Sequence, residues 1–413
     1  MRFRVACVAA VVAQRRRPEV DDAFKELTEE EFWPHFHVSK RTVHSLCDEL
    51  DPIIGCQRAS GLSTERKVCS LRFFGTGSFQ WSVGREEHIG MAQSAMSNII
   101  HEVMEAIISV SARRKLADFS LTTAAKNEAK AAFARCGAIP GVLACVDDTL
   151  IGIMKPVGQP GRHGELHVEK GLLRPKPVDS EYKYTLIDVG AEGRRSDGGV
   201  LKNSEFGKAL ENRSLGLPSA GELPGSGIVA PYAFLGDEAF QLREDFMRPF
   251  PAKQLRDDRR VFNYRLSRAR RCAENAFGIT AARWRILLRT INLHPKNVDY
   301  IVKAACILHN FFTVLNSQTR VHADKEDKFG NIIAGQWRHR IDTAQSNNAK
   351  PRYFALEATH ARNYNGSAAD ARKLFNAYFC SSAGEVSWQW LQPGITKEAA
   401  MRYVHEDQRL APC

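Results

Sequence analysis

The chain has 413 residues, 44% of them hydrophobic and 25% charged, and a net charge of +11. This length allows two or three domains with a large core, and the composition is that of an ordinary soluble globular protein. The ten cysteines form no C-x-x-C pair and show no zinc-site spacing, which excludes a zinc-finger framework and indicates a reducing compartment. The positive charge favours a polyanionic partner such as nucleic acid, with a solvated basic surface as the alternative.

The N-terminal segment, residues 1–30, is polar apart from one apolar run, and we expect it to be mobile. That run, Val5–Ala13, is followed by three arginines, a poor context for signal-peptide cleavage, and it is too short to span a bilayer. We therefore predict a short N-terminal helix there, and we expect no membrane partner.

Residues 31–120 are predicted to form a helical domain. Ser39 is placed to cap a helix with apolar residues at helical spacing, and Ser63 to begin a second one that ends near Gly75–Gly77. The pair Phe79–His88 and Gln93–Ile108 then indicates a helix-turn-helix, whose second helix would read the DNA major groove with its first residues. The candidate base-reading residues are Gln93, Ser94 and Asn98, although many helical hairpins share this pattern.

Strands alternate with helices over residues 121–316, which predicts an α/β domain. The expected strands are Val142–Asp147, Thr149–Met154, Tyr182–Val189 and Val229–Leu235. The expected helices are 121–137, Asn203–Asn212, Ala239–Met247, Asn263–Ala282 and Val298–Leu315. The remaining part, 317–413, is predicted to be a linker, through residue 350, followed by a helical tail with a helix near Ala368–Tyr378.

Three acidic residues stand out because each lies in a run that is otherwise apolar or basic. Asp147 and Asp237 each follow an apolar strand-like run, and Glu274 lies in a basic helical stretch. A carboxylate at a buried strand end is costly unless its charge is compensated, and carboxylate oxygens suit Mg²⁺ or Mn²⁺. The alternatives are a turn or cap at Asp147, a Gly-Asp turn at Asp237, and a helix ion pair between Arg270 and Glu274.

Six groups of residues form motifs that a known family shares. They are Cys145–Ile151, Ile187–Ala191 with Ser196–Val200, Leu235–Phe240, Phe262–Arg271, Glu274–Gly278 with Arg283–Arg285, and Cys306–Phe311. Through these motifs the chain resembles the PIF/Harbinger-type transposases and the Harbinger transposase-derived nucleases of animals. The resemblance covers roughly residues 35–315.

The resemblance implies an RNase H-like catalytic core with an N-terminal helix-turn-helix domain. It assigns the DDE carboxylate set to Asp147, Asp237 and Glu274, and a further metal-binding position to Asp197. It also implies a nuclease that cleaves DNA with two Mg²⁺ or Mn²⁺ ions, Asp147 bridging them. Family members are nuclear, which makes the nucleus the expected location and the cytoplasm a second one, and they often work with a Myb-like DNA-binding partner. The oligomeric state stays open.

Basic residues near the acidic set are candidates for phosphate contacts, with a solvated basic helix as the alternative. These are Arg268, Arg271, Arg283 and Arg285.

Two departures from the family pattern bear on activity. Asp148 stands where the family usually has glycine, and no apolar strand is evident between Met154 and Tyr182. Losing that strand would leave the strand of Asp147 without a partner, unless Glu165–Leu173 supplies a substitute. The alternative function is therefore a catalytically inactive, domesticated DNA-binding protein that retains the fold.

Overall fold

The structure is a computed structural model that describes ten stretches of the chain. These are residues 23–56, 61–117, 122–135, 139–154, 168–192, 201–251, 255–315, 323–327, 331–345 and 366–409. Three sequence-based predictions concern residues outside the described stretches. They are the mobility of the N-terminal segment up to residue 22, the helix at Val5–Ala13 and the metal-binding role of Asp197. The chain divides into two compact units, Met1–Val110 and Ser111–Cys413.

The first unit is helical where it is described, as predicted. Its helices are α2 (Ala23–Glu26), α3 (Glu29–Phe36), α4 (Lys40–Ile54), α5 (Thr64–Val68), α6 (Leu71–Thr76), α7 (Gln80–Gly84) and α8 (Gln93–Arg114), which runs past the boundary. The two predicted caps are present, because the hydroxyls of Ser39 and Ser63 accept hydrogen bonds from the amides of Thr42 and Arg66, both at 3.3 Å. Gly77 ends α6 in the left-handed conformation that favours glycine.

The second unit is built on a mixed five-stranded sheet, so the α/β prediction is confirmed. Its strand order is β3-β2-β1-β6-β7, where β1 and β2 and also β2 and β3 are antiparallel and the other pairs are parallel. The strands are β1 (Val142–Met154), β2 (Val168–Val178), β3 (Ala191–Glu192), β6 (Ala233–Leu235) and β7 (Phe246–Met247). Two small hairpins accompany the sheet: β4 (Gly221–Glu222) with β5 (Val229–Ala230), and β8 (Lys325–Glu326) with β9 (Ile332–Ile333).

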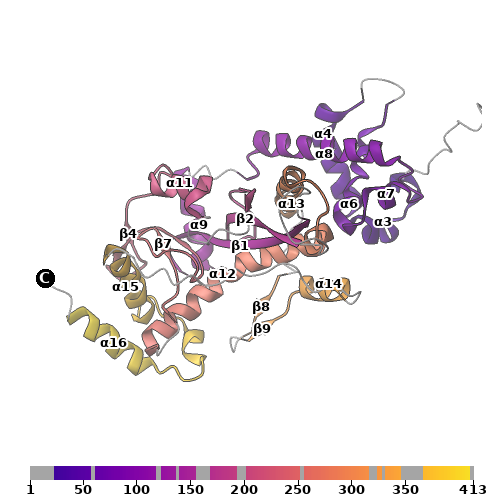
Figure 1. Ribbon diagram of the computed structural model, residues 1–413. Coiled ribbons are helices and arrows are strands. Elements are labelled where there is room, and N and C mark those ends of the chain that lie inside the picture. Colours follow the sequence, from indigo (N-terminus) through magenta and orange to yellow (C-terminus); the bar gives the residue numbers. More distant parts are fainter. Residues whose placement is uncertain are drawn as a thin grey trace, which may run out of the picture. The chain divides into compact units, whose positions relative to one another are not determined.

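Helix α12 (Asp257–Arg283) is the long helix that organises this unit (Figure 1). It packs against β1, β2 and β6 on one side, and it also contacts most of the C-terminal helices. The other helical elements are α9 (Thr123–Arg135), α11 (Glu205–Glu211), η1 (Arg285–Leu288), α13 (Pro295–Leu315), α14 (Gln336–Gln345), α15 (Gly366–Cys380), η3 (Ser387–Leu391) and α16 (Lys397–Arg409).

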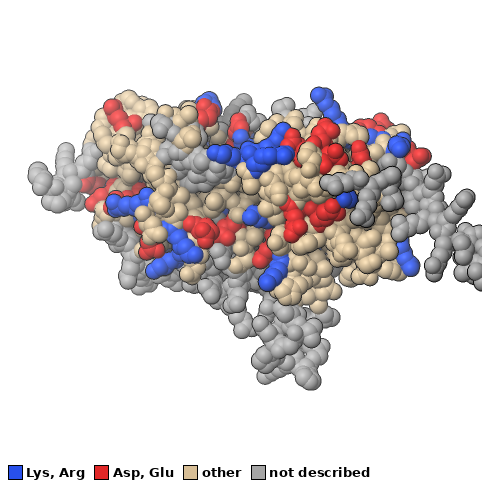
Figure 2. Space-filling view, turned by 90° about the horizontal axis from the view of Figure 1, so that it is seen from above, with Lys and Arg blue, Asp and Glu red and all other residues tan. Residues whose placement is uncertain are grey.

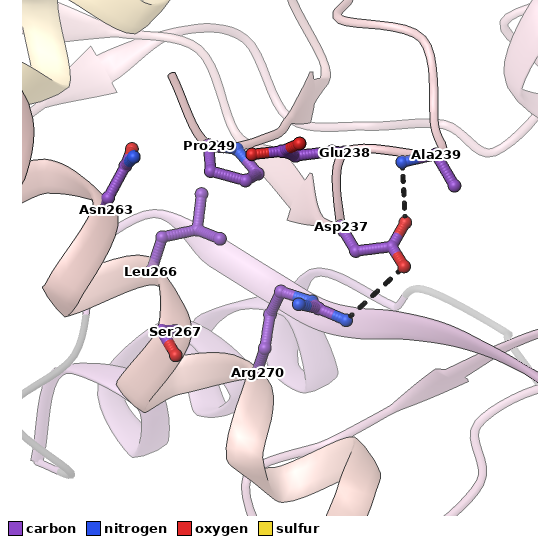
Figure 3. A pocket seen from close by; sticks show the side chains of 8 residues that line it. All are labelled: Asp237, Glu238, Ala239, Pro249, Asn263, Leu266, Ser267 and Arg270. Carbon is purple, nitrogen blue, oxygen red and sulfur yellow. Dashed lines mark hydrogen bonds and ion pairs between the residues drawn. The ribbon is translucent and has the colours of Figure 1, made fainter. Parts of the chain in front are cut away.

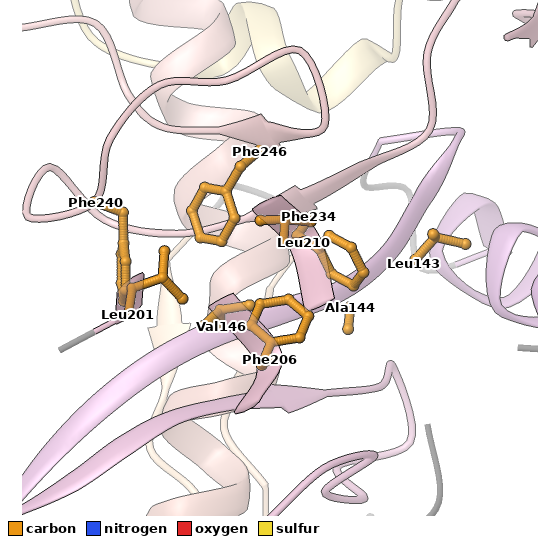
Figure 4. Close-up of a cluster of buried hydrophobic side chains, with 9 residues drawn as sticks. All are labelled: Leu143, Ala144, Val146, Leu201, Phe206, Leu210, Phe234, Phe240 and Phe246. Atoms are coloured by element: carbon orange, nitrogen blue, oxygen red, sulfur yellow. The ribbon is translucent and has the colours of Figure 1, made fainter. Parts of the chain in front are cut away.

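Successive side chains of β1 point to opposite faces of the sheet, so this strand contributes to the packing on both faces. Ala144 and Val146 join a buried cluster with Phe206 and Leu210 of α11 (Figure 4). Cys145 points the opposite way, and its thiol donates to the carbonyl of Ala269 on α12 at 3.3 Å. Asp147 lies two residues after Cys145, so its side chain points to the same face of the sheet and toward α12.

The strand that seemed to be missing is present, which corrects the sequence-based expectation. β2 pairs with β1 from Val178 back to Val168 through backbone hydrogen bonds, although its sequence lacks the apolar pattern by which a core strand is recognised. Asp147 lies opposite Lys176 and Thr149 opposite Leu173, which leaves β2 one residue longer across this step. Pro175 falls in that extra stretch, where an irregular ladder accommodates a residue without an N–H.

The predicted strand Tyr182–Val189 is wrong as a regular strand. Only an isolated bridge joins Tyr184 to Val178. The side-chain amide of Asn310 takes the place of a neighbouring strand: it accepts from the amide of Tyr184 at 2.9 Å and donates to the carbonyl of Tyr184 at 2.7 Å. The segment is thus held on one side by the Asn310 side chain and on the other by a short backbone contact with β2, in which the amide of Thr185 donates to the carbonyl of Pro177 at 2.8 Å.

Two further element predictions are corrected. Ala239–Met247 is not a helix, since it contains a turn and the strand β7, with Phe240, Leu242 and Phe246 turned into the core. Asp147 does not end a strand, because β1 runs unbroken from Val142 to Met154 and joins the two strands that were predicted.

The predicted linker, where it is described, holds the β8–β9 hairpin and α14, and α12 packs against α14. Among the described helices, α13 alone has the length and hydropathy of a membrane span, but 67% of its most apolar window is buried inside the protein, as in a core helix. On the face shown in Figure 2, acidic and basic side chains are interspersed, so this face presents no broad basic field.

Candidate active site

The parallel register of β1 and β6 brings Asp147, which lies within β1, beside Asp237, which follows the end of β6. Cys145 is paired with Leu235, and each aspartate lies two residues beyond its member of this pair. Because the two strands run in the same direction, the two side chains follow the same path out of the sheet. Both remain partly accessible, with side-chain exposures of 27% for Asp147 and 30% for Asp237.

Gly236 and the turn after it fix the position of Asp237. The amide of Gly236 donates to the carbonyl of Met247 at 2.9 Å, which continues the pairing of β6 with β7. The carboxylate of Asp237 then accepts a hydrogen bond from the amide of Ala239 at 2.9 Å (Figure 3). This local bond is the turn that the Gly-Asp alternative anticipated, and it holds the carboxylate toward α12.

Arg270 of α12 lies between the two aspartates. Its Nη2 is 3.4 Å from Oδ1 of Asp147. The same nitrogen is 4.0 Å from Oδ2 of Asp237 (Figure 3). Burial alone would lower the pKa of Arg270, but the carboxylates of Asp147, Asp237 and Glu274 offset it, so the pKa is raised above its ordinary value. All three acids of the predicted set therefore act on one guanidinium.

Glu274 is the third member of the set and lies one helical turn after Arg270. It is exposed, unlike its helix neighbours Ala273 and Asn275, which are buried. The carboxylate oxygens of the three acids fit Mg²⁺ or Mn²⁺ by donor chemistry. In the part of the chain that the structure describes, however, no three acidic, histidine or cysteine side chains converge closely enough to hold a metal ion.

A cavity of about 340 Å³ adjoins Arg270 and Asp237. It lies between α12 and the segment after β6, and Figure 3 shows Arg270 at its edge. Its lining residues are Asp237, Glu238, Ala239, Pro249, Asn263, Leu266, Ser267 and Arg270. The side chains of Arg270 and Asp237 therefore form part of the wall of this cavity.

Arg268 and Arg271, predicted to contact phosphates, both pair with Glu326 of the β8–β9 hairpin. Their guanidinium groups lie 2.8 Å and 2.7 Å from its carboxylate, which is only 4% exposed. Arg268 also stacks on the ring of Trp388 at 3.9 Å. As placed, these arginines are committed to internal contacts, which does not favour the predicted DNA contact.

Arg283 is buried at the end of α12 rather than presented to solvent. Burial, together with the nearby charge of Arg340, lowers its pKa to about 10, and its guanidinium lies 5.5 Å from the Phe312 ring. This position also disfavours a phosphate contact. By contrast, Gln93, Ser94 and Asn98 at the start of α8 are all exposed, as base-reading side chains would need to be.

Sequence reasoning noticed Arg270 only as a helix partner of Glu274, and it missed Glu326. The four-residue spacing of Arg270 and Glu274 could have pointed to Arg270, because it places both side chains on one face of α12. Nothing in the sequence pointed to Glu326, because it belongs to a segment that read as a linker.

Comparisons with known proteins bear on this arrangement. Residues 177–310 match a family described as "DDE superfamily endonuclease", a range that contains Asp237 and Glu274 and begins after Asp147. "Protein ALP1-like" of Arabidopsis thaliana is 28% identical over 265 residues, 62% of this chain and 62% of its own length. "Putative nuclease HARBI1" of Xenopus laevis is 26% identical over 264 residues, 61% of this chain and 69% of its own. No solved structure matches the chain.

The chain thus spans about three fifths of the Arabidopsis relative and about two thirds of the Xenopus one. The matched family and these relatives agree with the motifs that carried the resemblance. Residues 177–310 of this chain thus match the DDE superfamily endonuclease family, and the chain is similar to an ALP1-like protein and to a putative nuclease.

Proposed function

We propose that this protein is a divalent-metal-dependent DNA endonuclease of Harbinger transposase origin. The observation that carries the proposal is the parallel register of β1 and β6, which brings Asp147 and Asp237 close together beside α12. Two carboxylates carried by neighbouring strands, here facing the guanidinium of Arg270, are the kind of ligands that metal-assisted phosphodiester hydrolysis needs. The matched endonuclease family and the name of the Xenopus relative support the same reaction.

An RNase H-like core is part of this proposal. In such a core, the strand that carries the first aspartate pairs with the strand that follows it, and β1 pairs with β2 in this way. The long β1–β2 pairing supports a rigid mounting for Asp147.

Asp147, Asp237 and Glu274 would hold the metal, with Asp197 as a further ligand. When bound, Mg²⁺ or Mn²⁺ lowers the pKa of an attacking water and stabilises the departing 3′-oxygen. The protein's own contribution is to orient the carboxylates: the β-ladder fixes Asp147, the turn to Ala239 fixes Asp237, and α12 carries Glu274. The cavity beside Asp237 leaves the scissile phosphate a route to these oxygens.

DNA recognition by a helix-turn-helix in the first unit is also proposed. Its support is the turn between α7 and α8, closed by a hydrogen bond of 2.7 Å from the amide of Met91 to the carbonyl of Gly84, and the exposure of Gln93, Ser94 and Asn98. Location in the nucleus and a Myb-like partner follow from the family resemblance and carry no structural support of their own.

The test is cleavage of supercoiled plasmid in the presence of Mn²⁺. The protein should nick the plasmid, and Asp147→Ala and Asp237→Ala should each abolish nicking. Asp370→Asn is the matched control, because Asp370 is 67% exposed on α15 and its ion pair among the described residues is with Lys373 at 2.9 Å. It should cleave as the unaltered chain does, and cleavage that survives Asp147→Ala would refute the proposal.

A second candidate, a DNA-binding protein that has lost the reaction, is favoured by one observation. The cation between Asp147 and Asp237 in this structure is a guanidinium. The same plasmid assay separates the two, since the second candidate binds DNA in a salt-dependent way but leaves the plasmid intact with every metal.

A further inference from the structure

We infer that Arg270 is a built-in counter-ion that holds Asp147 and Asp237 together in the metal-free protein and competes with the divalent cation for them. It is a positioning residue whose guanidinium must withdraw before the metal binds. This inference rests on the proposed function and extends it to how the site is loaded.

The contacts of Arg270 are loose compared with those of its neighbours on α12. Charge-assisted pairs of this kind are usually about 2.7–2.9 Å long. Arg268 and Arg271 meet Glu326 at 2.8 Å and 2.7 Å, whereas Arg270 lies 3.4 Å and 4.0 Å from its two aspartates. The guanidinium is thus shared between two carboxylates rather than committed to one.

The guanidinium is also incompletely satisfied. Arg270 is 16% exposed, and its buried Nε has no hydrogen-bond partner among the described residues. A side chain that stays buried with an unused donor loses part of the hydrogen bonding that water would give it. What offsets this loss is the negative charge of Asp147 and Asp237, which would otherwise repel each other.

The charges favour an exchange of cations. Arg270 contacts the carboxylates of Asp147 and Asp237, and its single positive charge balances only one of their two negative charges. A divalent ion brings twice that charge and prefers carboxylate oxygens. The cavity that begins at Arg270 and extends along Leu266 and Ser267 gives the displaced side chain a space to enter (Figure 3).

Competition predicts a specific effect of removing the guanidinium. In Arg270→Gln, Mn²⁺ no longer has to displace a charged hydrogen-bonding group. The full chain should therefore bind Mn²⁺ about tenfold more tightly than the unaltered protein. In EDTA the same variant should melt at a lower temperature, and added Mn²⁺ should close that gap.

The experiment is a Mn²⁺ titration followed by electron paramagnetic resonance of the free ion, with thermal melts in EDTA and in Mn²⁺. Arg271→Gln is the matched control: it removes the neighbouring arginine, whose partner is Glu326, so it should lower the melting temperature equally in both conditions. Its Mn²⁺ affinity should be unchanged. Should Arg270→Gln fail to fold, Arg270→Met replaces it, because it also removes the positive charge between the two aspartates and should likewise tighten Mn²⁺ binding.

The outcomes separate this inference from the proposed function. If the unaltered chain binds Mn²⁺ and the Arg270 variants bind it equally or more weakly, Arg270 does not compete and the inference is wrong, while the metal site stands. If neither protein binds Mn²⁺, both the inference and the proposed metal site are overturned.

Discussion

Gly236 lies where the backbone between β6 and Asp237 passes two aromatic rings. A methyl group added there would sit 2.5 Å from a ring carbon of Phe246 and 2.6 Å from one of Phe240, both buried. We therefore expect Gly236→Ala to lower the free energy of unfolding by about 1–3 kcal/mol, as overpacking does. Urea denaturation measures this loss. Gly366→Ala, at the start of α15 with nothing within 4 Å, is the control and should unfold like the unaltered chain.

His309 on α13 makes the stability depend on pH. Burial, assisted by the charge of Arg283, lowers the pKa of His309 to about 3, and its Nε2 pairs with the carbonyl of Tyr182 at 2.7 Å. Because the folded pKa lies below the ordinary 6.5, the stabilisation is complete above pH 6.5 and declines as the pH falls from there toward 3. The decline should be about 1.4 kcal/mol per pH unit. Urea denaturation at pH 7 and pH 5 should show a smaller difference for His309→Gln, and equal differences would contradict this role.

At the level of residues, the sequence singled out the acids but not the side chains around them, and the catalytic role of the acids stays a prediction. Asp147 and Asp237 were found because a carboxylate after an apolar strand is rare and costly. Their neighbour Arg270 was read as an ordinary helix ion pair, since only the parallel register of β1 and β6 reveals that it lies between two strands. Predictions for Arg268, Arg271 and Arg283 took positive charge as a sign of exposure, but two of these pair with Glu326 and the third is buried.

The β8–β9 hairpin is attached to α12 through Glu326. This carboxylate meets Arg268 and Arg271 and also accepts a hydrogen bond from the hydroxyl of Tyr264. Removing one partner of a buried ion pair leaves the others uncompensated and typically costs about 3–5 kcal/mol. Glu326→Gln should therefore lower the free energy of unfolding by this order.

Asp370→Asn is the matched acid-to-amide control for this prediction. It breaks an exposed i,i+3 pair with Lys373, which is worth well under about 1 kcal/mol. Chemical denaturation of both variants gives the comparison. Equal stabilities of Glu326→Gln and Asp370→Asn would show that the hairpin is only loosely attached to α12.

At the level of elements, helices with a clear 3.6-residue pattern and a capping residue were predicted well, and short strands were not. The capped helix α4 and the long helices α12 and α13 are present as predicted, although α13 begins three residues and α12 six residues before its predicted start. Tyr182–Val189 was misread because only Tyr184 and Thr185 contact β2, and the side chain of Asn310 supplies the other hydrogen bonds of Tyr184, which no local pattern reveals. β2 was missed because its sequence contains two prolines, and β7 because two residues are too few to show a period of two.

The whole chain combines a helical unit with an α/β unit, and this division could be predicted from the change in pattern near residue 120. The compact units divide at Val110 and Ser111. What the sequence could not supply is the order of strands in the mixed sheet, because it depends on contacts between segments far apart in the chain, such as β1 with β6. The site depends on that order, since it is what brings Asp147 and Asp237 together.

The most direct test of this account is a crystal structure of the full chain grown with Mn²⁺ and examined by anomalous scattering at the manganese edge. We predict a manganese peak bound by the carboxylates of Asp147 and Asp237, with the guanidinium of Arg270 moved out of the space between them. A structure with Arg270 still between the two aspartates and no manganese beside them would contradict the account.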